Sequence, residues 1–257
     1  MTDATLGLLI MAYGTPRSLD EVAEYYTHIR HGRPPEPEAL AELIERYRAI
    51  GGVSPLNEIT ERQVAGITER VRRRLGQPVR AYMGMKHARP FIAEAVRALV
   101  ADGIRRCVAL VLTPQYSAMS VEGYHRAARD ELEALNADVE LLTIDHWHEH
   151  PGFITAVARR LEQTLAALPA EQRQQAMTVF TAHSLPQRLI EKGDPYAEQL
   201  QATAAAVARA AGVERWTFAY QSAGRTEVPW LGPDICAVIP ELAERGCTAV
   251  VACPIGF

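Results

Sequence analysis

The order of hydrophobic patterns along the chain constrains its fold more than any other feature. Short apolar runs rich in β-branched residues alternate with longer stretches in which apolar residues recur at spacings of three and four. The first pattern is typical of buried strands and the second of amphipathic helices. The expected strands are residues 6–13, 79–85, 107–112, 139–144, 176–182, 216–221 and 249–254. The expected helices are residues 58–75, 90–101, 120–135, 153–168, 195–211 and 234–245. This alternation predicts an α/β fold with parallel sheets covered by helices on both faces.

The strand and helix pattern restarts after a polar, histidine-rich segment at residues 146–152. We therefore expect two similar α/β halves, residues 1–148 and residues 149–257. The sequence stops at Ile255-Gly256-Phe257, directly after the last expected strand. Because an α/β domain seldom ends without a helix over its last strand, we expect the second half to be incomplete, with its C-terminal part missing.

Composition and charge exclude several classes of function. The formal net charge is −4, which does not favour nucleic acid as a partner. No apolar run is long enough to span a bilayer, and the N-terminus lacks the features of a signal peptide, so we expect a cytoplasmic protein without stable membrane insertion. The cysteines form no Cys-x-x-Cys pair and are interpreted as reduced thiols: Cys107, Cys236, Cys247 and Cys253.

Reactive side chains follow several of the expected strands. Tyr13 ends the first strand, Lys86 and His87 follow the second, Tyr116 follows the third, and His183 follows the first strand of the second half. In open parallel sheets the carboxyl ends of the strands hold ligands and reactive groups. An imidazole at such a place can accept a proton or bind a metal such as ferrous iron, which makes His183 the sharpest candidate.

Structural interpretations of these residues remain open beside the chemical ones. His183 could cap the next helix or complete a buried network, with Ser184 as the N-cap. Ser184 lacks the Gly-x-Ser-x-Gly elbow of a nucleophile. Tyr13 could simply pack its ring, and we expect Lys86 and His87 to be solvated.

Two basic or polar segments are also candidates for binding. Arginines and histidines gather between Arg30 and Arg48 with interleaved glutamates, which favours a solvated helix face. Gly51-Gly52-Val53-Ser54-Pro55 has the composition of a tight loop, and the Ser54 hydroxyl beside glycine amides could bind a carboxylate.

Several segments together resemble the ferrochelatase family, and in particular its soluble bacterial branch that acts on coproporphyrin III. The similar segments are residues 7–16, Tyr25-Tyr26-Thr27-His28-Ile29-Arg30, Arg46-Tyr47, residues 51–56, Thr181-Ala182-His183-Ser184-Leu185-Pro186, Gln221-Ser222 and Pro229-Trp230-Leu231-Gly232-Pro233. They extend over nearly the whole chain in the order that the family has. The resemblance implies two Rossmann-like halves with parallel four-stranded sheets and a porphyrin cleft.

The resemblance also implies roles for single residues. His183 would lie over the centre of the porphyrin, as the catalytic group that receives pyrrole protons or passes iron inward, and Tyr13 would approach the metal in the product from the other face. The residues that would contact the porphyrin or its propionates are Tyr13, Arg30, Arg46, Tyr47, Ser54 and Tyr124. Guanidinium and hydroxyl donors suit carboxylates, and aromatic walls suit a flat macrocycle.

The segment His28-Ile29-Arg30-His31-Gly32-Arg33-Pro34-Pro35 is polar and basic where membrane-associated relatives carry an apolar lip. It favours coproporphyrin III, a porphyrin rich in propionates, with Fe²⁺ as the second substrate. No further cofactor is expected, because the cysteines do not match the iron–sulfur pattern of some relatives. The family continues past the equivalent of Gly256-Phe257 into a helix with a His-x-Glu motif, which this sequence lacks.

Two other functions stay open at this point. A cobalt or nickel chelatase of a related tetrapyrrole would share the fold and the histidine. A non-catalytic porphyrin or heme carrier would bind the macrocycle without turnover. We expect the protein to be a monomer.

Overall fold

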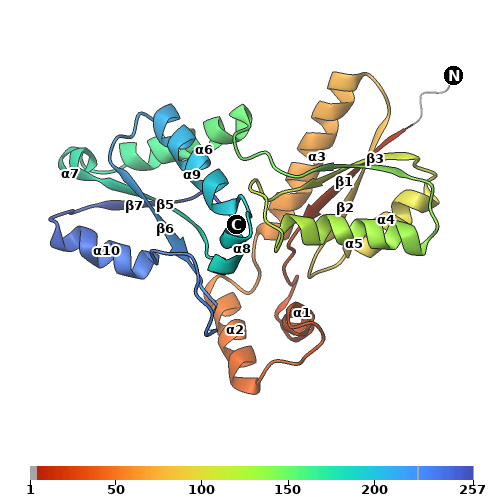
Figure 1. The fold of residues 1–257 in the computed structure, drawn as a ribbon, viewed down its shortest axis with the longest axis horizontal. Coiled ribbons are helices and arrows are strands. Elements are labelled where there is room, and N and C mark those ends of the chain that lie inside the picture. The colour runs from red at the N-terminus through yellow and green to blue at the C-terminus, as the bar shows by residue number, and fades with distance from the viewer. Residues whose placement is uncertain (1–4, 225, 257) are drawn as a thin grey trace. The chain divides into compact units, whose positions relative to one another are not determined.

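The computed structural model describes residues 5–224 and 226–256. The chain divides into two compact units, each built on its own parallel sheet (Figure 1). The first unit contains Met1–Leu112 and Gly123–Ile144, and the second contains Thr113–Glu122 and Asp145–Phe257.

The sheet of the first unit has four parallel strands in the order β2-β1-β3-β4. These strands are β1 (Leu6–Ala12), β2 (Val79–Met85), β3 (Arg106–Val111) and β4 (Glu140–Ile144). Every residue of β1 is buried, because this strand lies inside the sheet and both of its faces are covered. In the register, Leu8 lies between Ala81 on β2 and Val108 on β3.

The helices of this unit are α1 (Val22–Ile29), α2 (Pro37–Ala49), α3 (Leu56–Leu75), α4 (Ile92–Ala101) and α5 (Val121–Ala134), with a 3₁₀ turn, η1, at Leu19–Glu21. Helices α3 and α4 cover the two faces of its sheet. Apolar residues of α3 pack against Leu6, Leu8 and Ile10. The opposite face meets α4, where a Cβ at Gly84 would lie 3.0 Å from the Ile92 backbone. Helix α5 lies beside α4 (Figure 1).

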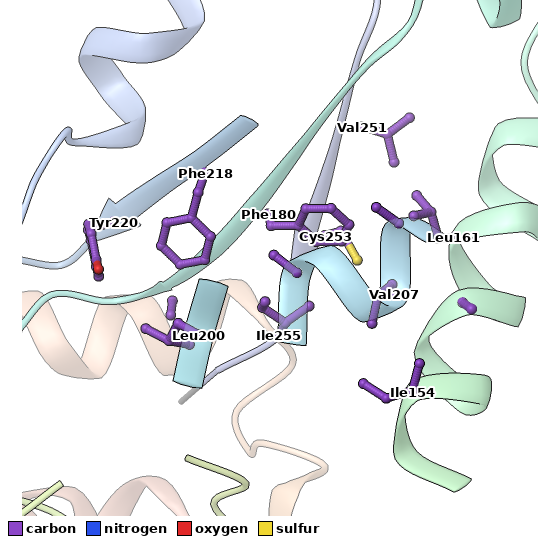
Figure 2. Close-up of a cluster of buried hydrophobic side chains, with 14 of the residues drawn as sticks. Ile154, Leu161, Phe180, Leu200, Val207, Phe218, Tyr220, Val251, Cys253 and Ile255 are labelled. Atoms are coloured by element: carbon purple, nitrogen blue, oxygen red, sulfur yellow. The ribbon is translucent and has the colours of Figure 1, made fainter. Parts of the chain in front are cut away.

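The second unit has a parallel sheet in the order β6-β5-β7. Its strands are β5 (Met177–His183), β6 (Trp216–Gln221) and β7 (Val250–Pro254), and its helices are α6 (Pro151–Ala166), α7 (Ala170–Gln175), α8 (Gln187–Glu191), α9 (Tyr196–Ala210) and α10 (Ile235–Glu244). Figure 2 shows the larger core, where Phe180, Phe218 and Val251 of the strands pack against α6 and α9. The other face of the sheet packs against Val238 and Leu242 of α10.

The α/β fold class predicted from the sequence is confirmed. Each expected strand and helix is present, with ends within two residues of the expected ones. Helices α1 and α7 are additional to these, whereas α2 lies within the segment between Arg30 and Arg48 that favours a helix face, and α8 follows the strand end where a helix after Ser184 is considered. The first sheet has the expected four strands, whereas the second has three among the described residues.

The compact units differ from the expected halves, residues 1–148 and 149–257, in two places. Residues 145–148 group with the second unit, and so does the segment Thr113–Glu122 between β3 and most of α5. Hydrogen bonds to α9 explain the second difference. The Gln115 side-chain amide donates to the Thr203 hydroxyl, and the Tyr116 backbone N–H donates to the Gln199 side chain.

Candidate active site

Reactive residues lie at the carboxyl ends of the strands in both units. Tyr13 directly follows β1, Lys86 and His87 follow β2, and His183 is the last residue of β5. In each sheet the first strand pairs with the second on one side and the third on the other. Strands β1 and β5 therefore occupy the point where the strand order reverses, which is where open α/β sheets bind ligands.

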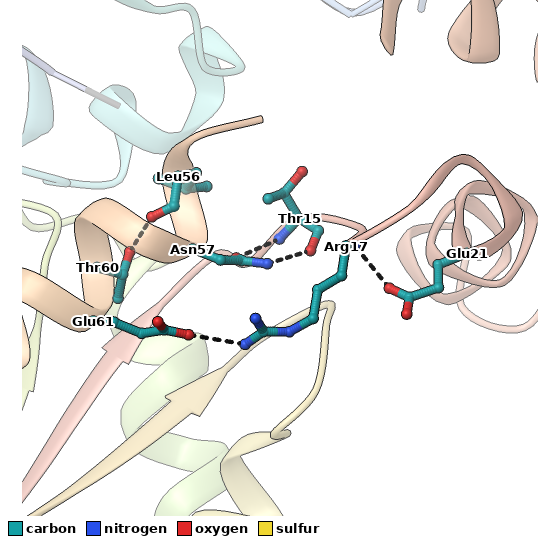
Figure 3. A network of polar contacts seen from close by, with 7 residues as sticks. All are labelled: Thr15, Arg17, Glu21, Leu56, Asn57, Thr60 and Glu61. Carbon is teal, nitrogen blue, oxygen red and sulfur yellow. Dashed lines mark hydrogen bonds and ion pairs between the residues drawn. The ribbon is translucent and has the colours of Figure 1, made fainter. Parts of the chain in front are cut away.

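The loop after β1 is held in place by its neighbours in the first unit. Asn57 at the start of α3 accepts a hydrogen bond from the Thr15 backbone N–H at 3.2 Å and donates one to the Thr15 carbonyl at 2.8 Å (Figure 3). Arg17 pairs with Glu61 at 3.1 Å, and its backbone N–H donates to Glu21. Because buried Asn57 satisfies both backbone groups of Thr15, the loop that carries Tyr13 has a defined course.

A series of rings extends from the surface to Tyr13. Phe91 stacks on His28 with ring centroids 4.9 Å apart, and the Nδ1 atoms of His28 and His87 lie 3.0 Å apart. The His87 ring in turn contacts the Tyr13 ring, with centroids 4.6 Å apart. One imidazole must donate and the other accept, so the two histidines hold each other's orientation and that of the Tyr13 ring.

The environment of these groups favours neutral side chains. Burial, and then the nearby Lys86 ammonium, His28 and His31, lower the pKa of His87 to about 4. Burial, with Tyr47 close by, raises the pKa of Tyr13 above its ordinary value. At neutral pH the region therefore presents an uncharged imidazole and an uncharged phenol.

His87 corrects one expectation drawn from the sequence. Its side chain is buried at 9% exposure and is not solvated, while Lys86 is half-buried with its ammonium 4.9 Å from the centre of the Tyr124 ring. Burial, and then Arg126, lower the pKa of Lys86. The side chain of His28, far along the sequence on α1, provides the polar partner that lets His87 be buried.

A cavity of about 310 Å³ lies against the same rings in the first unit. Its lining includes Tyr25, His28 and His87, with acidic groups from Glu21 and Glu24 and guanidinium groups from Arg17 and Arg89. The lining is thus mixed in charge, with aromatic surface between the charges.

The structure brings some of the predicted contact residues together. The Tyr47 hydroxyl lies 2.8 Å from the Thr15 hydroxyl, and Tyr47 is close enough to Tyr13 to affect its pKa. Tyr124 is 2% exposed, and burial, with Tyr13 nearby, raises the pKa of its phenol.

Other predicted contact residues have partners on their own helices or loops. Arg30 is exposed and places its guanidinium 5.9 Å from the centre of the Tyr26 ring. Arg46 is exposed and pairs with Glu42 one turn earlier on α2, as expected for a solvated helix face. The Ser54 hydroxyl accepts a hydrogen bond from the Leu56 N–H at 3.2 Å, at the start of α3.

Tyr25 and His28 belong to this region, although reasoning from the sequence assigned them no role of their own. Both are on α1, and burial, and then the nearby Tyr47 and Tyr13, raise the pKa of Tyr25. A signal was present, since Val22, Tyr25 and Ile29 recur at spacings of three and four, which is typical of an amphipathic helix.

In the second unit, the segment after His183 is held by hydrogen bonds to residues far along the chain. The Ser184 N–H donates to the Gln221 carbonyl at 2.8 Å, and the Ser184 hydroxyl donates to the Leu231 carbonyl at 2.7 Å. Leu231 in turn donates its N–H to the Leu185 carbonyl at 2.9 Å. Ser184 is therefore a structural residue at this strand end and does not cap α8, whose N-cap is Pro186.

The His183 imidazole is half-buried at the end of β5. Burial lowers its pKa below the ordinary value for histidine. Within residues 5–224 and 226–256 its ring makes no hydrogen bond, so the interpretation of His183 as part of a buried network is not supported there. A neutral, uncommitted imidazole can accept a proton or bind a metal.

The described part of the chain contains no preformed cluster of three or more histidine, cysteine or carboxylate side chains that could hold a metal ion. The four cysteines are free, and Cys107 and Cys253 are buried. Among the same residues, no helix combines the length and the apolar character needed to cross a membrane.

The fold and these residues define a two-unit α/β enzyme whose reactive side chains lie at the carboxyl ends of parallel strands. The family model described as Ferrochelatase matches residues 5–257, and the chain belongs to the ferrochelatase family.

Curated relatives match the whole of this chain. Coproporphyrin III ferrochelatase 2 of Bacillus cereus is 43% identical, and the match covers 80% of that protein. The coproporphyrin III ferrochelatase of Geobacillus kaustophilus is 44% identical over 82% of its length. The enzyme of the same name from Bacillus subtilis is 42% identical over 83% of its length.

Proposed function

We propose that this protein inserts ferrous iron into coproporphyrin III and so produces iron-coproporphyrin for heme biosynthesis. Membership of the ferrochelatase family supports the reaction, and the names of the relatives support the substrate. The observation that carries the proposal is the half-buried His183 imidazole, which has no hydrogen bond within the described residues and a lowered pKa.

His183 serves this reaction as a base or as a ligand that guides the metal. Iron enters the macrocycle as Fe²⁺ while the pyrrole protons leave, so no electron is transferred and no redox cofactor is needed. A neutral imidazole can take up one of those protons. Tyr13 approaches the metal in the product, and its raised pKa keeps the phenol neutral until it does so.

The substrate is held by cationic and hydroxyl groups. Arg30, His31 and Arg33 are exposed on the segment after α1, where a propionate-rich porphyrin can reach them. Arg46 contributes a guanidinium, Tyr47 and Tyr124 contribute aromatic rings, and Ser54 contributes a hydroxyl. We propose contacts of these residues with the porphyrin or its propionates.

Anaerobic insertion assays test this function. Coproporphyrin III fluorescence is followed after addition of Fe²⁺ to the protein and to two variants. His183→Ala should lower kcat by about 10²-fold or more, as expected for loss of a positioned base. His146→Ala is the control, because it removes an exposed imidazole of the same unit and should leave kcat unchanged.

Other outcomes distinguish the rival functions. Porphyrin binding without turnover, unaffected by His183→Ala, would indicate a carrier. Insertion of Co²⁺ or Ni²⁺ into sirohydrochlorin, together with failure on coproporphyrin III and Fe²⁺, would indicate the other chelatases. The absence of any cofactor beyond the substrate Fe²⁺, the monomeric state and the cytoplasmic location stay predictions.

A further inference from the structure

The peptide group that follows His183 is held from two sides within the second unit. Its N–H, which belongs to Ser184, donates to the Gln221 carbonyl at the end of β6. Its carbonyl, which belongs to His183, accepts a hydrogen bond from the Tyr196 hydroxyl at 3.0 Å. The backbone next to the imidazole is therefore fixed by a neighbouring strand and by the first residue of α9.

Tyr196 is itself held by a carboxylate. Asp194 accepts a hydrogen bond from the Tyr196 N–H with Oδ1 at 3.0 Å. Its Oδ2 accepts one from the Ser117 hydroxyl at 2.9 Å and one from the Ala118 N–H at 2.8 Å. A continuous set of hydrogen bonds thus leads from the segment Thr113–Glu122 through Asp194 and Tyr196 to His183.

A phenylalanine would fill the volume of the Tyr196 ring equally well. The side chain is 3% exposed, and a hydroxyl is costly in such a place unless it is hydrogen-bonded. Burial, and then Tyr220 and Asp194, raise the pKa of Tyr196, so the phenol stays protonated and can donate. A carbonyl oxygen can only accept, which makes this hydroxyl the donor to the His183 carbonyl.

We propose that Tyr196 and Asp194 are positioning residues for His183, and that they hold the end of β5 so that the imidazole points to its reacting partner. This inference rests on the proposed function of His183. Without the hydroxyl, the His183 carbonyl loses its partner from α9 and the strand end can shift. A displacement of about 1 Å at a reacting group can lower a rate by about 10²-fold.

Two tyrosine variants test the inference by enzyme kinetics. Tyr196→Phe should lower kcat for iron insertion by about tenfold or more and leave KM for the porphyrin within about twofold, because the defect is one of position. Tyr220→Phe is the matched control, a tyrosine of the same core that is 5% exposed, and it should keep the kcat of the unchanged protein.

Asp194→Asn tests the contribution of the carboxylate that holds Tyr196. Its amide oxygen can still accept from the Tyr196 N–H, but its NH₂ group cannot accept from Ser117 and Ala118. We expect a smaller fall in kcat than for Tyr196→Phe. The inference would be overturned if Tyr196→Phe and Asp194→Asn had the same kcat as Tyr220→Phe and the unchanged protein. It would also be overturned if the fall in kcat of Tyr196→Phe were accounted for by a smaller fraction of folded protein.

A readout without turnover separates this inference from the proposed function. The imidazole Cε1–H resonance of His183, assigned by its loss in His183→Ala, should broaden or move in Tyr196→Phe and stay in place in Tyr220→Phe. A sharp, unmoved resonance in Tyr196→Phe refutes the positioning role, whereas failure of the unchanged protein to metallate coproporphyrin III refutes only the function.

Discussion

Gly14, in the loop between β1 and α1, has a left-handed backbone conformation and is closely surrounded by neighbouring atoms, so a larger residue fits poorly there. Its φ is +82°, and a Cβ there would lie 2.8 Å from the Ala88 Cβ and 2.9 Å from the Met85 Cβ. Replacement by alanine adds strain of roughly 1–2 kcal/mol in the left-handed region. Overpacking against the two neighbours adds about 1–3 kcal/mol. We therefore expect Gly14→Ala to lower the free energy of unfolding by about 2–5 kcal/mol.

Gly76→Ala is the control that separates the two contributions. Gly76 ends α3 with a φ of +65°, and no atom lies within 4 Å of the Cβ that alanine would add. In this variant the free energy of unfolding should fall only by the backbone strain, about 1–2 kcal/mol. Urea unfolding followed by far-UV circular dichroism measures both variants. A difference between them below about 0.5 kcal/mol would refute the argument that the loop is closely packed at Gly14.

Three further substitutions have defined outcomes. Ser184→Ala removes a buried donor to the Leu231 carbonyl and should cost about 1–3 kcal/mol in urea unfolding while iron insertion continues; a folded variant without turnover would contradict the structural role. His87 is neutral in both states above its unfolded pKa of 6.5, and as the pH falls towards 4 the unfolded chain binds the proton first. The free energy of unfolding should therefore fall by about 2 kcal/mol between pH 7 and pH 5, and it should fall by less in His87→Gln. Equal falls in the two proteins would contradict the low pKa. Tyr82→Phe breaks the 2.8 Å hydrogen bond to Asp102 and should lower the free energy of unfolding by about 0.5–1.5 kcal/mol, a cost that unchanged urea midpoints would exclude.

The sequence alone predicted the α/β class, the positions of the strands and main helices, and the place of His183 at a strand end. These features depend on local periodicity, since a buried strand and an amphipathic helix each repeat their apolar residues at a characteristic spacing. Helix α2 gives only a weak apolar pattern because it has no buried residue, and α7 and α8 are too short to show a period.

Only the tertiary structure decided which polar groups meet. His87 is buried because His28, 59 residues earlier, provides a partner for its ring. The segment Thr113–Glu122 joins the second unit because Asp194, 76 residues after Ala118, binds its backbone. The Tyr196 hydroxyl reaches the His183 carbonyl only once α9 has packed on β5. Such contacts leave no periodic trace in the sequence, because the residues that satisfy a buried polar group can come from anywhere along the chain.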